Sequence, residues 1–265
     1  MQAQEENPLE ELLRLAADEP AHRPAFCDAL LEAQVFLLGT TGQVEGEGQV
    51  NLEAGSEVQI QHWERTDGSP VIPFFTSLAV LQQSIDEEQT YMELPVRSLF
   101  EMTLGATLML NPKSDYGKEF VPAEVEQLLN HGVSRMPEQR VVEKETQVLL
   151  GQPAEYPSKL VDSLTQLFAL NSNVQRAYLA LMHDPSVDEK AHLIIGVEAD
   201  GDAEKVINAA GNVAGDLAAE GEPVDLCRVT PGEEGLSEYF INETTPFYEK
   251  KWGAKLKSFL GFGRA

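Results

Sequence analysis

The residues that most often carry chemistry show no spacing typical of a catalytic or metal site. A metalloprotease helix would carry H-E-x-x-H and a hydrolase elbow G-x-S-x-G, and neither motif occurs in the sequence. The Walker and dinucleotide-binding glycine patterns are also missing. Five histidines share no ligand spacing: His22, His62, His131, His183 and His192. We therefore expect a protein that is not an enzyme and that holds neither a cofactor nor a metal ion.

The 44 acidic residues leave one enzymatic alternative open, a pair of carboxylates that converge in a cleft. The sequence offers no means of choosing such a pair. The run from Glu198 to Asp202 resembles a fragment of a calcium-binding loop, but the spaced ligands and the closing glutamate are missing. We expect Asp202 to cap the following helix instead.

The last twenty residues have a chemistry suited to binding. Residues 246–265 carry five basic residues, one acidic residue and five aromatic residues, whereas residues 1–245 carry 14 basic and 43 acidic residues. Two interpretations stay open: this tail packs on the acidic body, or it forms a short amphipathic helix for a partner or a membrane surface. The candidate partner-binding residues in the tail are Lys250, Lys251, Trp252, Lys255, Leu256, Lys257, Phe259 and Phe262.

A second candidate is the polar segment Asn111–Lys118, in which Lys113 and Lys118 bracket Asp115 and Tyr116. Asparagine, proline, serine, aspartate and glycine in one short run are typical of a turn. One interpretation is a solvated turn between two elements. The other is a recognition tip, because scaffolds commonly carry binding residues on such loops. Lys113, Asp115, Tyr116 and Lys118 are the candidates here.

Composition narrows the class of protein and of partner. The net charge of −25 repels phosphate backbones, so we expect no nucleic-acid partner. Cys27 and Cys227 lie far apart without a C-x-x-C partner, which argues against a disulfide scaffold. The start lacks the features of a signal peptide, and no window approaches the ~20 apolar residues that span a bilayer. We expect a cytoplasmic protein without a transmembrane segment.

The elements that must position the polar segment form a mixed α/β domain, predicted over residues 1–130. Its most regular part is 94–129, where Pro95 begins a short helix, 106–110 reads as a buried strand, and Pro122 begins another helix. The pair Asp67-Gly68 predicts a hairpin. A further short strand is expected at 49–53.

The elements that precede the tail form a second domain, predicted over residues 146–245 after a charged linker at 131–145. The apolar patterns predict strands at 146–150, 174–182, 191–197 and 223–229, with helices at 157–170 and 202–219. The order β-α-β-β-α-β predicts a ferredoxin-like sandwich. Together the two halves predict an α+β protein of two domains.

Several stretches resemble the enhanced serine sensitivity protein (SseB) family. In the first half these are LPVRSLFEMTLGATLMLNP, DYGKEF and PAEVEQLL, and in the second half VQRAYLALM, HLIIGVEAD and the closing aromatic and basic tail. The resemblance spans nearly the whole chain. It implies a bacterial protein with an N-terminal and a C-terminal family domain, and a name that records a growth phenotype on serine. No catalytic residues of the family carry over.

We therefore expect a non-enzymatic cytosolic accessory protein that acts by binding an unidentified protein. The alternative is a regulatory protein that binds a small ligand such as an amino acid, which rests on the fold analogy and on the family's serine-linked name. A weak contact of the tail with a membrane surface, or with a second copy of the chain, is the remaining alternative.

Overall fold

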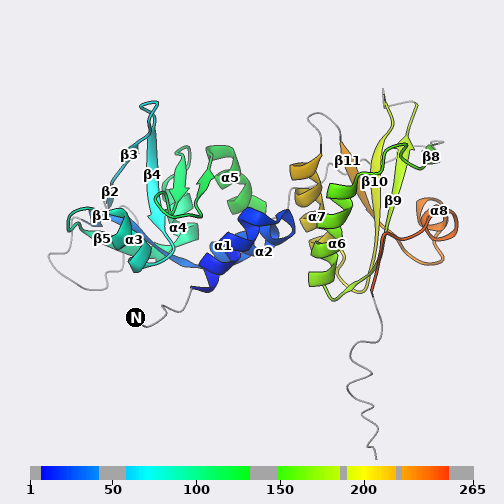
Figure 1. Cartoon of the computed structure of the whole chain (residues 1–265), viewed down its shortest axis with the longest axis horizontal. Coiled ribbons are helices and arrows are strands. Elements are labelled where there is room, and N and C mark those ends of the chain that lie inside the picture. The colour runs from blue at the N-terminus through cyan, green and yellow to red at the C-terminus, as the bar shows by residue number, and fades with distance from the viewer. Residues whose placement is uncertain (1–6, 42–57, 132–147, 186–189, 219–222, 251–265) are drawn as a thin grey trace, which may run out of the picture. The chain divides into compact units, whose positions relative to one another are not determined.

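The computed structural model describes residues 7–41, 58–131, 148–185, 190–218 and 223–250 (Figure 1). The chain divides into two compact units, Met1–Val133 and Ser134–Ala265. Each unit holds helices packed on a β-sheet, so the predicted mixed α/β class is confirmed. The strand expected at 49–53, and all but the first residue of the expected linker 131–145, lie outside the described residues.

The first unit is built on a seven-stranded sheet with β1, β4 and β6 at its centre. β1 runs antiparallel to β4 and β5, whereas β4 and β6 are parallel, and β7 pairs with β6. The hairpin predicted at Asp67-Gly68 joins β3 to β4. The strands are β1 (Gln34–Thr41), β2 (Val58–Ile60), β3 (Trp63–Glu64), β4 (Pro70–Phe75), β5 (Tyr91–Pro95), β6 (Leu108–Leu110) and β7 (Lys118–Phe120).

Most helices of this unit share one core with one face of the sheet. They are α1 (Pro8–Asp18), α2 (Arg23–Leu31), α4 (Val96–Met102) and α5 (Pro122–His131), with a 3-10 turn η1 (Pro20–His22) between the first two; α3 (Leu78–Ser84) is the exception. Side chains alternate along β1, so Val35 and Leu37 enter the main core while Leu38 packs with Leu81 of α3 in a smaller cluster. The helices and the strand predicted within 94–129 are present, and β7 was not predicted.

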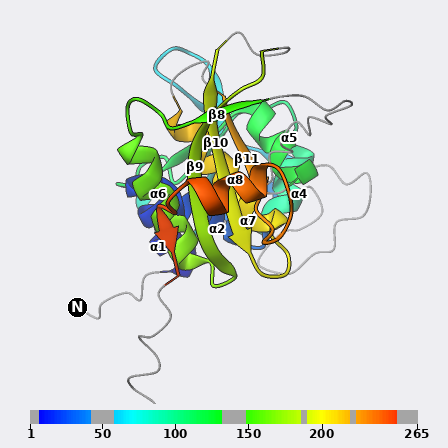
Figure 2. The same ribbon diagram turned by 90° about the vertical axis from the view of Figure 1, so that its right-hand side faces the viewer.

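The second unit is built on a five-stranded sheet in the order β11, β10, β9, β12, with β8 also paired to β9. Its strands are β8 (Leu149–Gly151), β9 (Val174–His183), β10 (His192–Ala199), β11 (Val224–Arg228) and β12 (Tyr248–Glu249). The helices α6 (Ser158–Leu170) and α7 (Glu204–Leu217) lie on one face, and α8 (Leu236–Glu243) lies on the other (Figures 1 and 2). Neither α8 nor β12 was predicted.

The ferredoxin-like detail is not confirmed, although the order β8-α6-β9-β10-α7-β11 agrees with the prediction. A split βαβ unit has an antiparallel strand between its two parallel strands. Here β10 and β11 pair directly and in parallel across α7, and β8 pairs antiparallel with β9 at the edge. The sequence pattern therefore predicted which helices and strands form, but not which strands lie side by side in the sheet.

Candidate functional site

The predicted recognition tip begins at a buried asparagine. Asn111 is 2% exposed and has a φ of 49°, a left-handed conformation that asparagine tolerates better than most residues. Its Oδ1 accepts the backbone N–H of Thr76 at 3.0 Å, and its Nδ2 donates to the Thr76 hydroxyl at 3.0 Å. The turn is thus held to the end of the neighbouring parallel strand β4. Sequence reasoning identified the turn but not the buried amide that holds it.

The same polar network reaches the first helix. The Thr76 hydroxyl donates to Glu10 Oε1 at 2.7 Å, and the Ser77 hydroxyl donates to the same oxygen at 2.8 Å. Asn7, which caps α1, donates from Nδ2 to the carbonyl oxygen of Thr76 at 3.0 Å. These contacts connect α1, β4 and the turn, and they satisfy polar groups that burial would otherwise penalise. Because these contacts join elements of the first unit to one another, we assign the network a role in holding the fold.

Both lysines of the predicted tip are engaged by the body of the first unit. Lys113 Nζ lies 5.3 Å from the ring centroid of Trp63 in β3, a cation–π distance. Lys118 pairs with Glu124 of α5 at 2.8 Å and lies over the Phe120 ring. Asp115 and Tyr116 are exposed. The structure therefore places Lys113, Asp115 and Tyr116 on an exposed turn and the half-buried Lys118 at the start of β7. Of the exposed three, Lys113 already contacts the body.

The predicted tail starts inside the second sheet rather than after it. β12 pairs with β9 through Tyr248 and Glu249, and the Lys250 N–H donates to the Gln175 carbonyl oxygen at 2.8 Å. The Lys250 ammonium also donates to the carbonyl oxygen of Ser172. Residues 246–250 therefore pack on the body, whereas the packing expected of Trp252 and Phe259 concerns residues outside the described ranges.

Two aromatic residues fix this segment on α6. The rings of Phe247 and Tyr248 lie 6.1 and 5.8 Å from the ring of Phe168, and the Tyr248 hydroxyl donates to the Phe168 carbonyl oxygen at 3.2 Å. Of the tail candidates, only Lys250 is described. The others lie outside the described residues: Lys251, Trp252, Lys255, Leu256, Lys257, Phe259 and Phe262.

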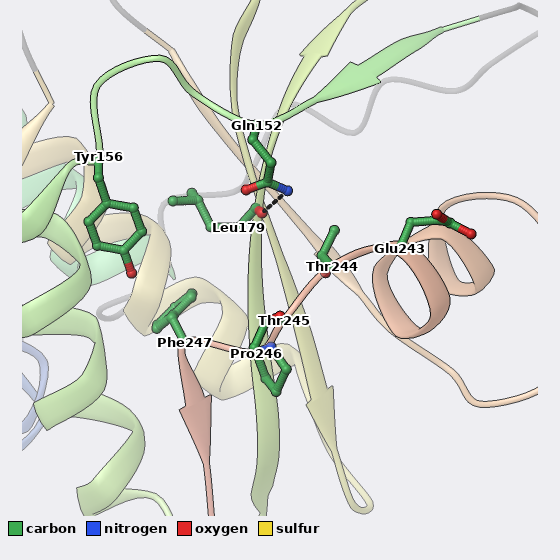
Figure 3. Close-up of a pocket in the computed structure, with 8 residues that line it drawn as sticks. All are labelled: Gln152, Tyr156, Leu179, Glu243, Thr244, Thr245, Pro246 and Phe247. Carbon is green, nitrogen blue, oxygen red and sulfur yellow. Dashed lines mark hydrogen bonds between the residues drawn. The ribbon is translucent and has the colours of Figure 1, made fainter.

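A pocket of about 440 Å³ lies beside β9, between the segment that follows β8 and the segment that leads into β12 (Figure 3). It is lined by Gln152, Tyr156, Leu179, Glu243, Thr244, Thr245, Pro246 and Phe247. Its size is typical of a small-ligand site. None of these eight residues is basic, and Glu243 is the one charged residue among them. Sequence reasoning missed this pocket because its walls come from segments about ninety residues apart.

Charged groups on the second sheet pair with one another. Arg176 of β9 bonds to Glu249 of β12 at 3.0 Å and lies 3.6 Å from Glu198 of β10. The hydrogen bond with Glu249 raises the pKa of Arg176, and burial raises the pKa of Tyr178, which donates to Glu198 at 3.4 Å. The contact with Glu249 ties β12 to β9, and the two contacts with Glu198 tie β9 to β10.

The remaining side chains that could take part in a reaction are the His192–Asp225 pair and the Cys227 thiol. The His192 ring lies 2.8 Å from the Asp225 carboxylate. Burial, followed by the Asp225 and Glu233 carboxylates, raises the pKa of Cys227 to about 12. Over the described ranges no group of three or more His, Cys, Asp or Glu could hold a metal ion. Among the helices that the structure describes, none is long and apolar enough to cross a membrane.

Comparison with known proteins gives consistent matches over nearly the whole chain. Residues 9–127 match the family model described as SseB protein N-terminal domain, and residues 142–250 match SseB protein C-terminal domain. Proteins described as Protein SseB from Escherichia coli (strain K12) and from Shigella flexneri are each 45% identical over 253 residues, which cover 96% of both chains. No solved structure matches the chain significantly.

Proposed function

We propose that this chain, which belongs to the SseB family, acts by binding another protein and not by catalysis. The proposed contact is the basic and aromatic segment 251–265. This segment carries four basic residues and no acidic residue, in a chain with a net charge of −25. Charge of that sign on so acidic a protein favours an acidic surface on the partner.

The observation that carries the proposal is the attachment of the preceding residues. Residues 246–250 are held on the second sheet by strand pairing, by two aromatic contacts with Phe168 and by both nitrogens of Lys250. The basic segment therefore starts from a fixed point on the body. A fixed start reduces the conformational freedom that binding would otherwise have to remove.

The exposed part of the Asn111–Lys118 turn is a second candidate contact. Asp115 and Tyr116 are exposed on a turn that the buried Asn111 side chain holds in place. Tyrosine is common at the centre of protein interfaces because it buries a large area at a low cost in conformational entropy. Lys113 and Lys118 would contribute less, since each already has a partner in the body.

A pull-down with two forms of the chain tests the proposed contact. The comparison is between the full chain and a chain that ends at Lys250, because an earlier end at Thr245 would remove β12 and the aromatic contacts with Phe168. We expect a partner that the full chain recovers and the shortened chain loses. Replacing Lys251, Lys255 and Lys257 by glutamine in the full chain should also reduce the amount of this partner that is recovered. Identical sets of recovered proteins, or none, would contradict the proposal.

The amino-acid alternative has less support from the pocket beside β9. The carboxylate of a free amino acid would find no basic side chain among the eight lining residues. A thermal-shift series with serine and related amino acids at millimolar concentration tests it, because specific binding stabilises the folded protein. A cytoplasmic location and the lack of a nucleic-acid partner belong to the same proposal, and the second rests on the net charge of −25, which repels phosphate backbones.

A further inference from the structure

The outer edge of β9 is paired near both ends and open in the middle. On this side β8 pairs with residues 181–183, and β12 pairs with residues 176–177. Leu179 lies between these stretches. Because the backbone groups of every second residue point to the same side of a strand, Leu179 directs its N–H and C=O to the side on which Ala177 accepts the Phe247 N–H. Edge-strand backbone groups therefore face the pocket.

A proline keeps β8 from closing this gap. Continuing the register of Gly151 opposite Leu181 by two residues would place Pro153 opposite Leu179. Proline has no N–H and cannot donate to that carbonyl oxygen. The Gln152 side chain takes its place, with Nε2 3.5 Å from the Leu179 oxygen (Figure 3). A bond of that length is weak, so the oxygen can accept a better donor.

The other walls of the pocket restrict which ligands could donate a hydrogen bond to the Leu179 carbonyl oxygen. The Glu243 carboxylate points away from Leu179 (Figure 3), and the Thr244 hydroxyl donates to the Phe240 carbonyl oxygen at 2.6 Å. Tyr156, 54% exposed, and the half-buried Phe247 offer apolar ring surface. An anionic ligand would meet no basic group in the lining, on a body whose residues 1–245 carry 43 acidic and 14 basic residues. An extended polypeptide with basic side chains supplies backbone N–H groups at strand spacing and a favourable charge.

We propose that the gap at Leu179 binds an extended, basic segment of a partner protein by strand addition. A backbone N–H of that segment donates to the Leu179 oxygen in place of Gln152 Nε2. The four residue steps from Ala177 to Leu181 span ~13 Å at about 3.3 Å per residue, enough for roughly three residues of the partner. The residues that line this site all precede residues 251–265, so separate variants test the two contacts.

The sharpest probe is a pair of synthetic peptides that differ only in backbone donors. One is a labelled hexapeptide of alternating lysine and valine, and the other carries the same side chains with every backbone N–H methylated, so that neither edge of the extended peptide can donate. Fluorescence anisotropy with the full chain should show saturable binding of the first peptide and at least about fivefold weaker binding of the second, since one net hydrogen bond is lost. Equal affinities would show attraction by surface charge alone and would overturn the proposal.

Two substitutions locate the site. Thr245→Trp adds a large ring at an exposed residue of the pocket wall, and Thr90→Trp makes the same change at an exposed residue of the first unit. Thr245→Trp should abolish saturable binding and Thr90→Trp should leave it unchanged, with unchanged thermal unfolding in both. Equal binding by Thr245→Trp and the unaltered chain would overturn the proposal. So would the absence of saturable binding at millimolar peptide, because backbone pairing does not require one particular sequence.

Discussion

Asn111 combines three properties that single substitutions can separate: burial, a left-handed backbone, and hydrogen bonds to the backbone N–H and the hydroxyl of Thr76. Asn111→Ala should lower the free energy of unfolding of the first unit by about 3 kcal/mol, because it leaves a buried N–H unpaired and places a Cβ-bearing residue at positive φ. Asn111→Gly should cost about 1 kcal/mol less, since glycine adopts this conformation without strain. Urea unfolding measures both. Equal stability of the two variants, close to that of the unaltered chain, would refute this account of the turn.

Cys227 gives a second test at the scale of one residue. Burial and the nearby carboxylates raise its pKa to about 12 from the ordinary 9.0, so at pH 8 only about one thiol in ten thousand is ionised. With Cys27→Ser, which leaves Cys227 as the one thiol, a disulfide reagent should react about a thousandfold more slowly with the folded chain than with the chain unfolded in urea. Rates within tenfold of each other would contradict the raised pKa of this half-buried thiol.

At the scale of elements, α8 packs where β10 has no side chain. A Cβ at Gly196 would lie 2.6 Å from Val229 Cγ2 and 2.8 Å from two ring carbons of Phe240, whereas a Cβ at Gly151 in β8 would meet nothing within 4 Å. Gly196→Ala should therefore destabilise the second unit by about 2 kcal/mol, because α8 must shift, while Gly151→Ala should be close to neutral. Urea unfolding compares them. Equal effects would mean that α8 does not pack on β10 as described.

β12 is the element on which the proposed function depends. Ending the chain at Thr245 should lower the free energy of unfolding of the second unit by about 3 kcal/mol, because Phe247 and Tyr248 no longer cover Phe168. Ending it at Lys250 should leave that value nearly unchanged. Calorimetry of the two shortened chains decides the point, and equal stabilities would show that β12 contributes nothing.

Local patterns predicted most elements but not their non-local pairing. Proline at the start of α4 and α5 and apolar spacing in α6 and α7 were sufficient to predict these helices. β12 has two residues and pairs with a strand about seventy residues earlier, and α8 covers a face that the local sequence does not identify. The pocket was not predicted for the same reason. It lies at the edge of β9 beside Leu179, and that edge is defined only by the pairing of β8 and β12 on either side.

At the scale of the whole molecule, the two proposed contacts differ in chemistry. The segment 251–265 is basic and suits an acidic partner, whereas the gap at Leu179 is lined by neutral and acidic groups and suits a basic one. Both belong to the second unit. In the first unit, the turn is held in place by the network of Asn7, Glu10, Thr76 and Asn111. The candidate contact with a partner there is formed by Asp115 and Tyr116.

The most direct test of the central proposal is transfer of residues 251–265 to an unrelated, stable carrier protein. The affinity of the carrier for the partner recovered by the full chain is then measured by calorimetry at low and at high salt. We expect binding that weakens with salt, because exposed charges are screened, and that is lost when the three lysines are replaced by glutamine. The proposal would be contradicted if the partner did not bind the carrier and if it bound the chain ending at Lys250 as tightly as the full chain.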